Sequence, residues 1–370
     1  MNRIAIILFS IFILFFFSVW LNYFSKNTTT LPQNISTISQ ENKTEYSPTP
    51  KPEKENVFLF VPYWTLSSGS SLKESYGSLI YFGISANEKG VNKNEDGYKN
   101  ITRFNSQFEN EKNKYLTLRM LDSEANSKVL KDKKIQNKII IDSLTIAKEN
   151  SFRGLVLDFE TQGLPFESLI NRISSFYKLF YIQTKNENLD FLITVYGDNF
   201  YRIRPYDIKE LAKNSDKVLI MAYDFHKAKG NPGPNFPFSA KETYGYDFKT
   251  MIDDFLNLVP EEKLVIIFGL YGYDWKVDED NQAKESGEAV SFNKIKDKFL
   301  SNCKYESCLV KRDIKSLETK ITYIDENSIN HILWFEDVYS VDKKREFINE
   351  KNINQIGYWA YSYFPFDTVE

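Results

Sequence analysis

The chain has few of the residues that build metal and redox sites, with 2 His and 2 Cys among its 370 residues. A tetrahedral zinc site needs three or four such ligands, so the composition predicts no metal and no cofactor in the chemistry. The chain also lacks an excess of one charge, because 47 Lys+Arg against 50 Asp+Glu leave a net charge of -3. Without a basic excess to neutralise a phosphate backbone, nucleic acid is not an expected partner.

Aromatic residues, by contrast, make up 16% of the chain, while a hydrophobic content of 42% is ordinary for a globular protein. The aromatic excess suits a cleft whose ligands stack on rings.

The longest apolar run lies at the amino terminus, at residues 4–21. Its length of about 18 residues approaches the ~20 that a helix needs to cross a bilayer. No small-residue cleavage pattern follows, so we expect an uncleaved membrane anchor over residues 1–26; a cleaved segment would instead give a secreted protein. Residues 27–55 are rich in Thr, Ser, Asn, Pro and Lys and are predicted to form a disordered tether. The expected location is the cell membrane, crossed once, with residues 56–370 folded outside the cytoplasm.

Short apolar runs recur along the rest of the chain and are bounded by polar segments. They lie at residues 57–61, 79–84, 115–120, 154–159, 191–196, 218–223, 264–270 and 355–361. Between them lie stretches of helical period, for example 135–148 and 166–183. Alternation of strand and helix in this number predicts a (β/α)8 TIM barrel, an α/β fold whose active sites lie at the carboxyl ends of the strands.

One interval, about 276–330, is too long and polar for an ordinary connection and is predicted to be a small inserted subdomain between strands 7 and 8. Cys303 and Cys308 lie inside it. Outside the membrane they would close a small disulfide loop, and two free thiols are the alternative.

The run at 154–159 leads into a pair of carboxylates. Because side chains alternate along a strand, Val156, Asp158 and Glu160 share one face. Two interpretations stand: the carboxylates belong to an active site at the end of a barrel strand, or they begin a loop and cap the next helix.

Several strand ends together resemble glycoside hydrolase family 18, the chitinase and endo-N-acetylglucosaminidase family, especially its cell-wall-lytic and spore-germination branch. Asp158 and Glu160 match the last two acids of the family's Asp-x-x-Asp-x-Asp-x-Glu. Residues 221–224 resemble its Met-x-Tyr-Asp, and residues 271–275 resemble its Tyr-Gly-x-Asp-Trp. With an eighth strand ending at Trp359, the resemblance spans residues 57–364.

The resemblance implies a retaining mechanism in which the acetamido oxygen of the substrate is the nucleophile. In that mechanism Glu160 is the proton donor, Asp158 holds the acetamido nitrogen, and Tyr223 binds the acetamido oxygen. The resemblance further implies substrate contacts from Asp224, Met221, Trp359, Tyr63 and Tyr271.

The chain departs from the family pattern at Val156, where relatives usually carry an acid or Asn that hydrogen-bonds the position of Asp158. The expected function is a membrane-tethered extracytoplasmic glycoside hydrolase that cleaves β-1,4 linkages of N-acetylglucosamine-containing polymers. Peptidoglycan and chitin-like substrates both remain open. The alternative is a catalytically inactive, chitinase-like protein that only binds glycans.

Overall fold

The computed structural model describes residue 53 and residues 56–66 and 76–363. The predicted membrane segment, 1–26, lies outside the described residues, and so does the predicted tether, 27–55, apart from residue 53. No helix in the described part of the chain has the length and apolarity to span a bilayer.

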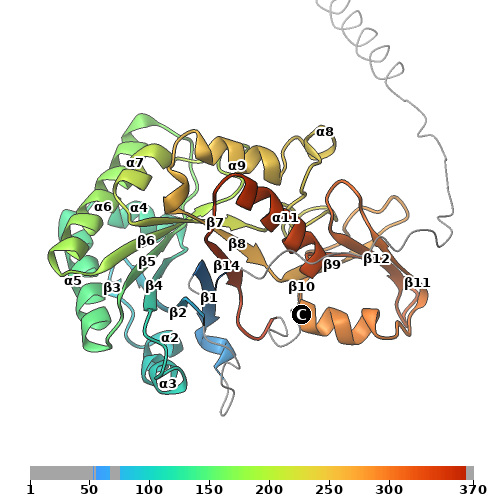
Figure 1. Ribbon diagram of the computed structural model, residues 1–370, viewed down its shortest axis with the longest axis horizontal. Helices are drawn as coiled ribbons and strands as arrows, with labels where there is room; N and C mark the ends of the chain where they lie inside the picture. Colours follow the sequence, from blue (N-terminus) through green and yellow to red (C-terminus); the bar gives the residue numbers. More distant parts are fainter. Residues whose placement is uncertain (1–52, 54–55, 67–75, 364–370) are drawn as a thin grey trace, which may run out of the picture. The chain divides into compact units, whose positions relative to one another are not determined.

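Eight parallel strands form a closed barrel with helices around it (Figure 1), and they confirm the predicted (β/α)8 architecture. Closure occurs because the first strand pairs on one side with the second strand and on the other side with the last. The strands follow one another around the barrel in the order β1-β14-β8-β7-β6-β5-β4-β2. Their bounds, in the same order, are β1 Val57–Pro62, β14 Ile356–Trp359, β8 Leu264–Gly269, β7 Lys217–Ala222, β6 Asp190–Tyr196, β5 Gly154–Phe159, β4 Lys114–Met120 and β2 Ser78–Asn87.

The strands have two apolar faces because the barrel is packed on both sides. Side chains such as Phe60, Val156, Leu192 and Val265 fill the interior as one buried cluster. The alternate residues pack outward in a second, larger cluster with the helices. This packing explains why each strand appears in the sequence as a continuous apolar run.

Helices follow most of the strands, and several begin at an Asp whose carboxylate accepts from backbone N–H groups of the first turn. Asp132 caps α5, Asp247 caps α9, and Asp337 caps α11 with Ser340 in a capping box. The helices are α2 Asp96–Lys99, α3 Ile101–Gln107, α4 Ser123–Val129, α5 Lys133–Glu149, α6 Glu167–Asn186, α7 Ile208–Lys213, α8 Lys241–Tyr244, α9 Phe248–Leu256, α10 Phe292–Ile295 and α11 Val338–Glu350.

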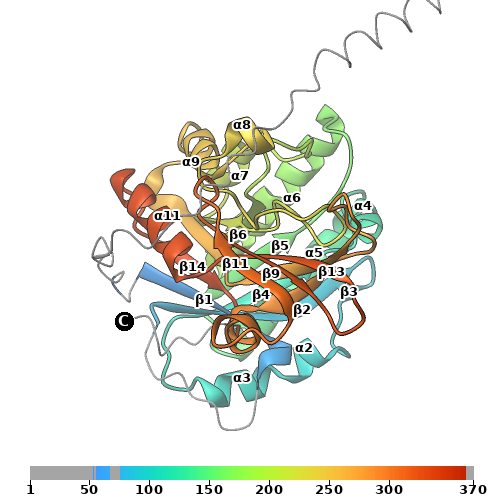
Figure 2. The ribbon, with the colours of Figure 1, turned by 90° about the vertical axis from the view of Figure 1, so that its right-hand side faces the viewer.

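A second sheet, of five antiparallel strands, lies in the chain between β8 and β14. It stands beside the barrel in Figure 1 and in front of it in Figure 2. In the order β10-β9-β13-β12-β11, its strands are Glu288–Ser291, Tyr271–Val277, Asn330–Phe335, Thr319–Ile324 and Glu306–Arg312. A two-residue strand, β3 (Gly90–Val91), pairs with β2 instead.

The second sheet begins earlier in the chain than the polar stretch at 276–330. Its first strand, β9, starts immediately after Leu270, the last residue of the predicted barrel strand 264–270. The aromatic residues at 271–275, which the sequence resemblance placed at the end of that barrel strand, therefore belong to the second sheet. Cys303 and Cys308, the latter within β11, form a disulfide, which decides between the two alternatives left open by the sequence.

Candidate active site

A cavity of about 380 Å³ lies at the carboxyl ends of the barrel strands. Of the residues predicted for the site, seven line it: Asp158, Glu160, Met221, Tyr223, Asp224, Tyr271 and Trp359. Tyr63 is not among the lining residues, whereas its neighbour Trp64 is. Both residues belong to a 3-10 turn, Tyr63–Thr65, where the alternation of a strand no longer sets the direction of a side chain.

Asp158 is the buried member of the carboxylate pair, with 3% of its surface exposed. Its Oδ1 atom accepts a hydrogen bond from the Thr194 hydroxyl on β6 at 2.5 Å. Burial, reinforced by the negative charge of Glu160, raises the pKa of Asp158 to about 7, against the lowering effect of the Thr194 hydrogen bond. Asp158 is therefore poised to change its protonation state near neutral pH.

Val156 lies two residues before Asp158 and is fully buried inside the barrel. On the adjacent strand it pairs with Thr117, whose buried hydroxyl has no hydrogen-bond partner among the described residues. The Asp158 carboxylate is thus held from β6, by Thr194, and not by the residue at position 156.

Glu160 follows the last residue of β5 and accepts a hydrogen bond at Oε2 from the Tyr196 hydroxyl at 2.7 Å. The Tyr196 ring is covered by the Arg204 guanidinium, which lies 3.5 Å from the ring centroid. Arg204 in turn donates from Nε to Asp198 at 2.8 Å. A fixed ring therefore presents its hydroxyl to Glu160.

Tyr223 and Asp224 follow β7 directly, and Asp224 adopts the left-handed backbone region with φ of 59°. The Asp224 carboxylate accepts hydrogen bonds from the hydroxyls of Tyr271 and Tyr273, the latter at 2.8 Å. Burial raises the pKa of Tyr223 well above its ordinary value, so the phenol keeps its proton and remains a hydrogen-bond donor.

Trp359, the last residue of β14, forms an aromatic floor together with rings from β1 and β2. Its centroid lies 5.5 Å from that of Phe60 and 4.7 Å from that of Phe82. The Tyr223 ring is stacked beside it at 6.4 Å. The cavity therefore has a polar wall, which carries the carboxylates, and an apolar base.

Thr194 and Tyr196 contact the two carboxylates but are absent from the sequence-based site. Their signal is present in the sequence, because residues 194 and 196 alternate with the outward-packed Ile193 and Val195 at the end of a predicted strand. In the described part of the chain, no cluster of three or more His, Cys, Asp or Glu is placed to hold a metal ion.

Known proteins of similar sequence include two from Bacillus. The cortical fragment-lytic enzyme of Bacillus anthracis is 26% identical over 246 residues, which is 64% of this chain and 53% of the relative. The uncharacterized glycosylase YvbX of Bacillus subtilis (strain 168) is 22% identical over 231 residues, 58% of this chain and 59% of the relative. The chain spans about half the length of these curated relatives.

Solved structures share the fold. The group IV chitinase of Ostrinia furnacalis in complex with allosamidin superposes with a TM-score of 0.69 at 19% identity, covering 85% of this chain and 94% of that one. The spore cortex-lytic enzyme SleL of Bacillus cereus superposes with a TM-score of 0.66 at 21% identity, and the match covers 86% of this chain and 73% of that one. The sequence model of Glycosyl hydrolases family 18 matches residues 27–363. This chain therefore belongs to glycosyl hydrolases family 18.

Proposed function

We propose that the protein is a membrane-tethered, extracytoplasmic enzyme that cleaves β-1,4 linkages next to N-acetylglucosamine in peptidoglycan, with retention of configuration. The observation that carries the proposal is the arrangement of Asp158, Glu160 and Tyr223 around one cavity above the Trp359 ring. The anchor and the tether rest on the composition of residues 1–55.

In the proposed reaction, Glu160 donates its proton to the leaving oxygen while the acetamido oxygen attacks the anomeric carbon. The Asp158 carboxylate accepts the acetamido N–H and stabilises the positive charge that develops on the cyclic intermediate. The Tyr223 hydroxyl donates to the acetamido oxygen and orients it. Glu160, now a carboxylate, then takes a proton from water, which opens the intermediate and restores the starting state.

An anionic glycan is favoured over chitin by the positive charge of Lys227. Lys227 lines the cavity near Glu160, and its Nζ atom lies 5.4 Å from the centroid of the Tyr196 ring. Within the described residues it forms no ion pair, whereas Asp198, which also lines the cavity, is neutralised by Arg202 and Arg204. Peptidoglycan carries carboxylates and chitin does not, so a substrate carboxylate would give Lys227 a partner. The name of the cortical fragment-lytic relative supports the same choice.

A second candidate function is glycan binding without cleavage, which Val156 favours because an apolar residue stands where an acid or Asn usually assists Asp158. The two functions share the same cavity and differ only in turnover.

The test is mass spectrometry of products from peptidoglycan and from chito-oligosaccharides, with the parental protein, Glu160→Gln and, as a matched control, Glu124→Gln on the surface of α4. Loss of the proton donor should lower kcat by roughly 10²- to 10⁴-fold, while the control stays at the parental rate. Cleavage by Glu160→Gln at the parental rate would contradict the proposed role. Tight oligosaccharide binding by the parental protein without any cleavage would favour the second function.

A further inference from the structure

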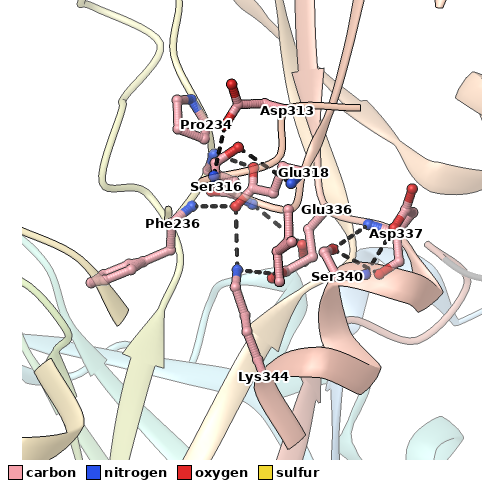
Figure 3. A network of polar contacts seen from close by, with 12 residues as sticks. Pro234, Phe236, Asp313, Ser316, Glu318, Glu336, Asp337, Ser340 and Lys344 are labelled. Atoms are coloured by element: carbon pink, nitrogen blue, oxygen red, sulfur yellow. Dashed lines mark hydrogen bonds and ion pairs between the residues drawn. The ribbon is translucent and has the colours of Figure 1, made fainter. Parts of the chain in front are cut away.

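A fully buried group of charges lies away from the cavity, where α11 meets the second sheet (Figure 3). The Lys344 ammonium on α11 is within 3.3 Å of the Glu318 carboxylate and forms a still shorter contact with Glu336. All three side chains have an exposed fraction of 0%. Glu318 immediately precedes β12 and Glu336 immediately follows β13, so the group joins the second sheet to a barrel helix.

One ammonium and two carboxylates leave an excess negative charge, which is costly without water. The hydrogen bonds indicate which carboxyl carries a proton. Both Glu318 oxygens accept backbone N–H groups, from Asn235 at 2.5 Å and from Phe236 at 2.7 Å, and this is the pattern of an ionised carboxylate. Burial raises the pKa of both carboxyls, but Glu336 has one oxygen without a partner in the described part of the chain. The neutral arrangement is thus a Lys344–Glu318 ion pair beside a protonated Glu336.

The Glu318 carboxylate is connected to the cavity through a single residue, Asn235, in the loop after β7. The backbone N–H of Asn235 donates to Glu318, and its side-chain Oδ1 accepts from the backbone N–H of Asp224 at 2.7 Å. The Asn235 amide also reaches the carbonyl oxygens of Gly269 and Tyr271, each at 3.3 Å. Asn235 thereby contacts Asp224, and it also contacts β9, the strand whose tyrosines bind the Asp224 carboxylate.

We propose that Glu318 is a positioning residue for the hydrolytic reaction: it fixes Asn235, which holds the Tyr223–Asp224 pair in the orientation that the substrate requires. The second sheet therefore takes part in catalysis through a residue that does not touch the cavity. This inference rests on the roles proposed above for Tyr223 and Asp224.

Two isosteric substitutions separate positioning from simple structural support. Glu318→Gln and Glu336→Gln each leave one carboxylate to pair with Lys344, so the charge balance of the two variants is the same. A glutamine at 318 can accept only one of the two backbone N–H groups and turns its NH₂ toward the other. A glutamine at 336 places its NH₂ where the oxygen has no partner and loses no hydrogen bond.

The experiment measures kcat, KM and thermal midpoint for both variants on the substrate that the parental protein cleaves, together with a crystal structure of Glu318→Gln. We expect kcat to fall about 100-fold for Glu318→Gln, as misplacement of a site by about 1 Å can cost, with a smaller change in KM. Glu336→Gln should keep the parental kcat and KM. Equal kinetics for the two folded variants would overturn the proposal.

Two further results keep the proposal open to refutation. If Glu318→Gln does not fold, Asn235→Ala replaces it, since it keeps the backbone bond to Glu318 and loses the contact with Asp224; parental kcat in Asn235→Ala would overturn the proposal. If the parental protein cleaves nothing, the proposed function fails on its own, and the crystal structure decides the inference. Unchanged hydrogen bonds from Asn235 and the two tyrosines to Asp224 in Glu318→Gln would then refute it.

Discussion

The hydrogen bond from Thr194 to Asp158 gives a prediction that depends on one atom. Thr194→Val keeps the shape of the side chain and removes the hydroxyl that donates to the buried Oδ1 at 2.5 Å. Hydrogen bonds to charged groups contribute about 1.5–3 kcal/mol, which corresponds to a roughly 10- to 150-fold loss of kcat/KM if the bond is needed in the transition state. The loss should appear in initial rates on a soluble oligosaccharide substrate.

The pH profile gives the same substitution a second readout. The Thr194 bond lowers the pKa of Asp158, so its removal raises that pKa further above the parental value of about 7. In the proposed reaction the ionised form of Asp158 accepts the acetamido N–H, and the acidic limb of the kcat/KM profile should therefore move to higher pH.

Thr117→Val is the matched control, because the buried Thr117 hydroxyl has no partner among the described residues. It should leave kcat/KM and the pH profile unchanged. A Thr194→Val protein with parental kcat/KM and parental pH profile, or equal losses in both valine variants, would refute the reasoning.

Three other predictions follow from the described contacts. Lys227→Met should lower kcat/KM on a carboxylate-bearing glycan by roughly 2- to 5-fold, as a partly exposed ion pair does, and leave neutral chito-oligosaccharides unaffected; exposed Lys229→Met is the control, and equal losses on both substrates would exclude charge recognition. The stability of the parental protein relative to Asp158→Asn should fall as pH rises from about 4 to 7, by ~4 kcal/mol at most, because the unfolded carboxyl ionises near 3.9 and the folded one near 7; thermal midpoints that run parallel over this range would contradict it. Reduction of Cys303–Cys308 should cost about 2 kcal/mol of stability, from the short loop that it closes, and leave kcat unchanged, since neither residue lines the cavity; a large loss of kcat in the folded, reduced protein would show that the loop supports the site.

The barrel could be predicted because each of its strands is buried on both faces and therefore reads as a short apolar run. The apolar run at 154–159 placed Asp158 and Glu160 at the carboxyl end of a strand, and alternation placed them on one face. The residues that support them could not be chosen in the same way. Alternation directs Thr194 and Tyr196 inward, but the sequence does not say that β6 pairs next to β5 with these hydroxyls at the height of the carboxylates.

The buried charges around Lys344 could not be predicted from the sequence, for a different physical reason. Glu318 lies in a stretch that is mostly polar, and a glutamate there is ordinarily solvated. Only the folded chain shows that Lys344, 26 residues later, and two backbone N–H groups from the loop after β7 surround it. Long-range pairing of this kind leaves no periodic signal.

The four-residue strand β14 has a consequence for the time course of folding. It pairs with β1 through Val57 and Ile356, two residues separated by almost the whole folded domain, and with β8 across the intervening second sheet. Contacts of such sequence separation form slowly, because the entropy of closing a long loop is lost before the contact is made. Until β14 arrives, β1 and β8 each expose an edge of unpaired backbone groups, and the Trp359 floor is missing. A nascent chain therefore completes the base of its cavity only when β14 closes the barrel, and until then its open strand edges are the part most exposed to mispairing with another chain.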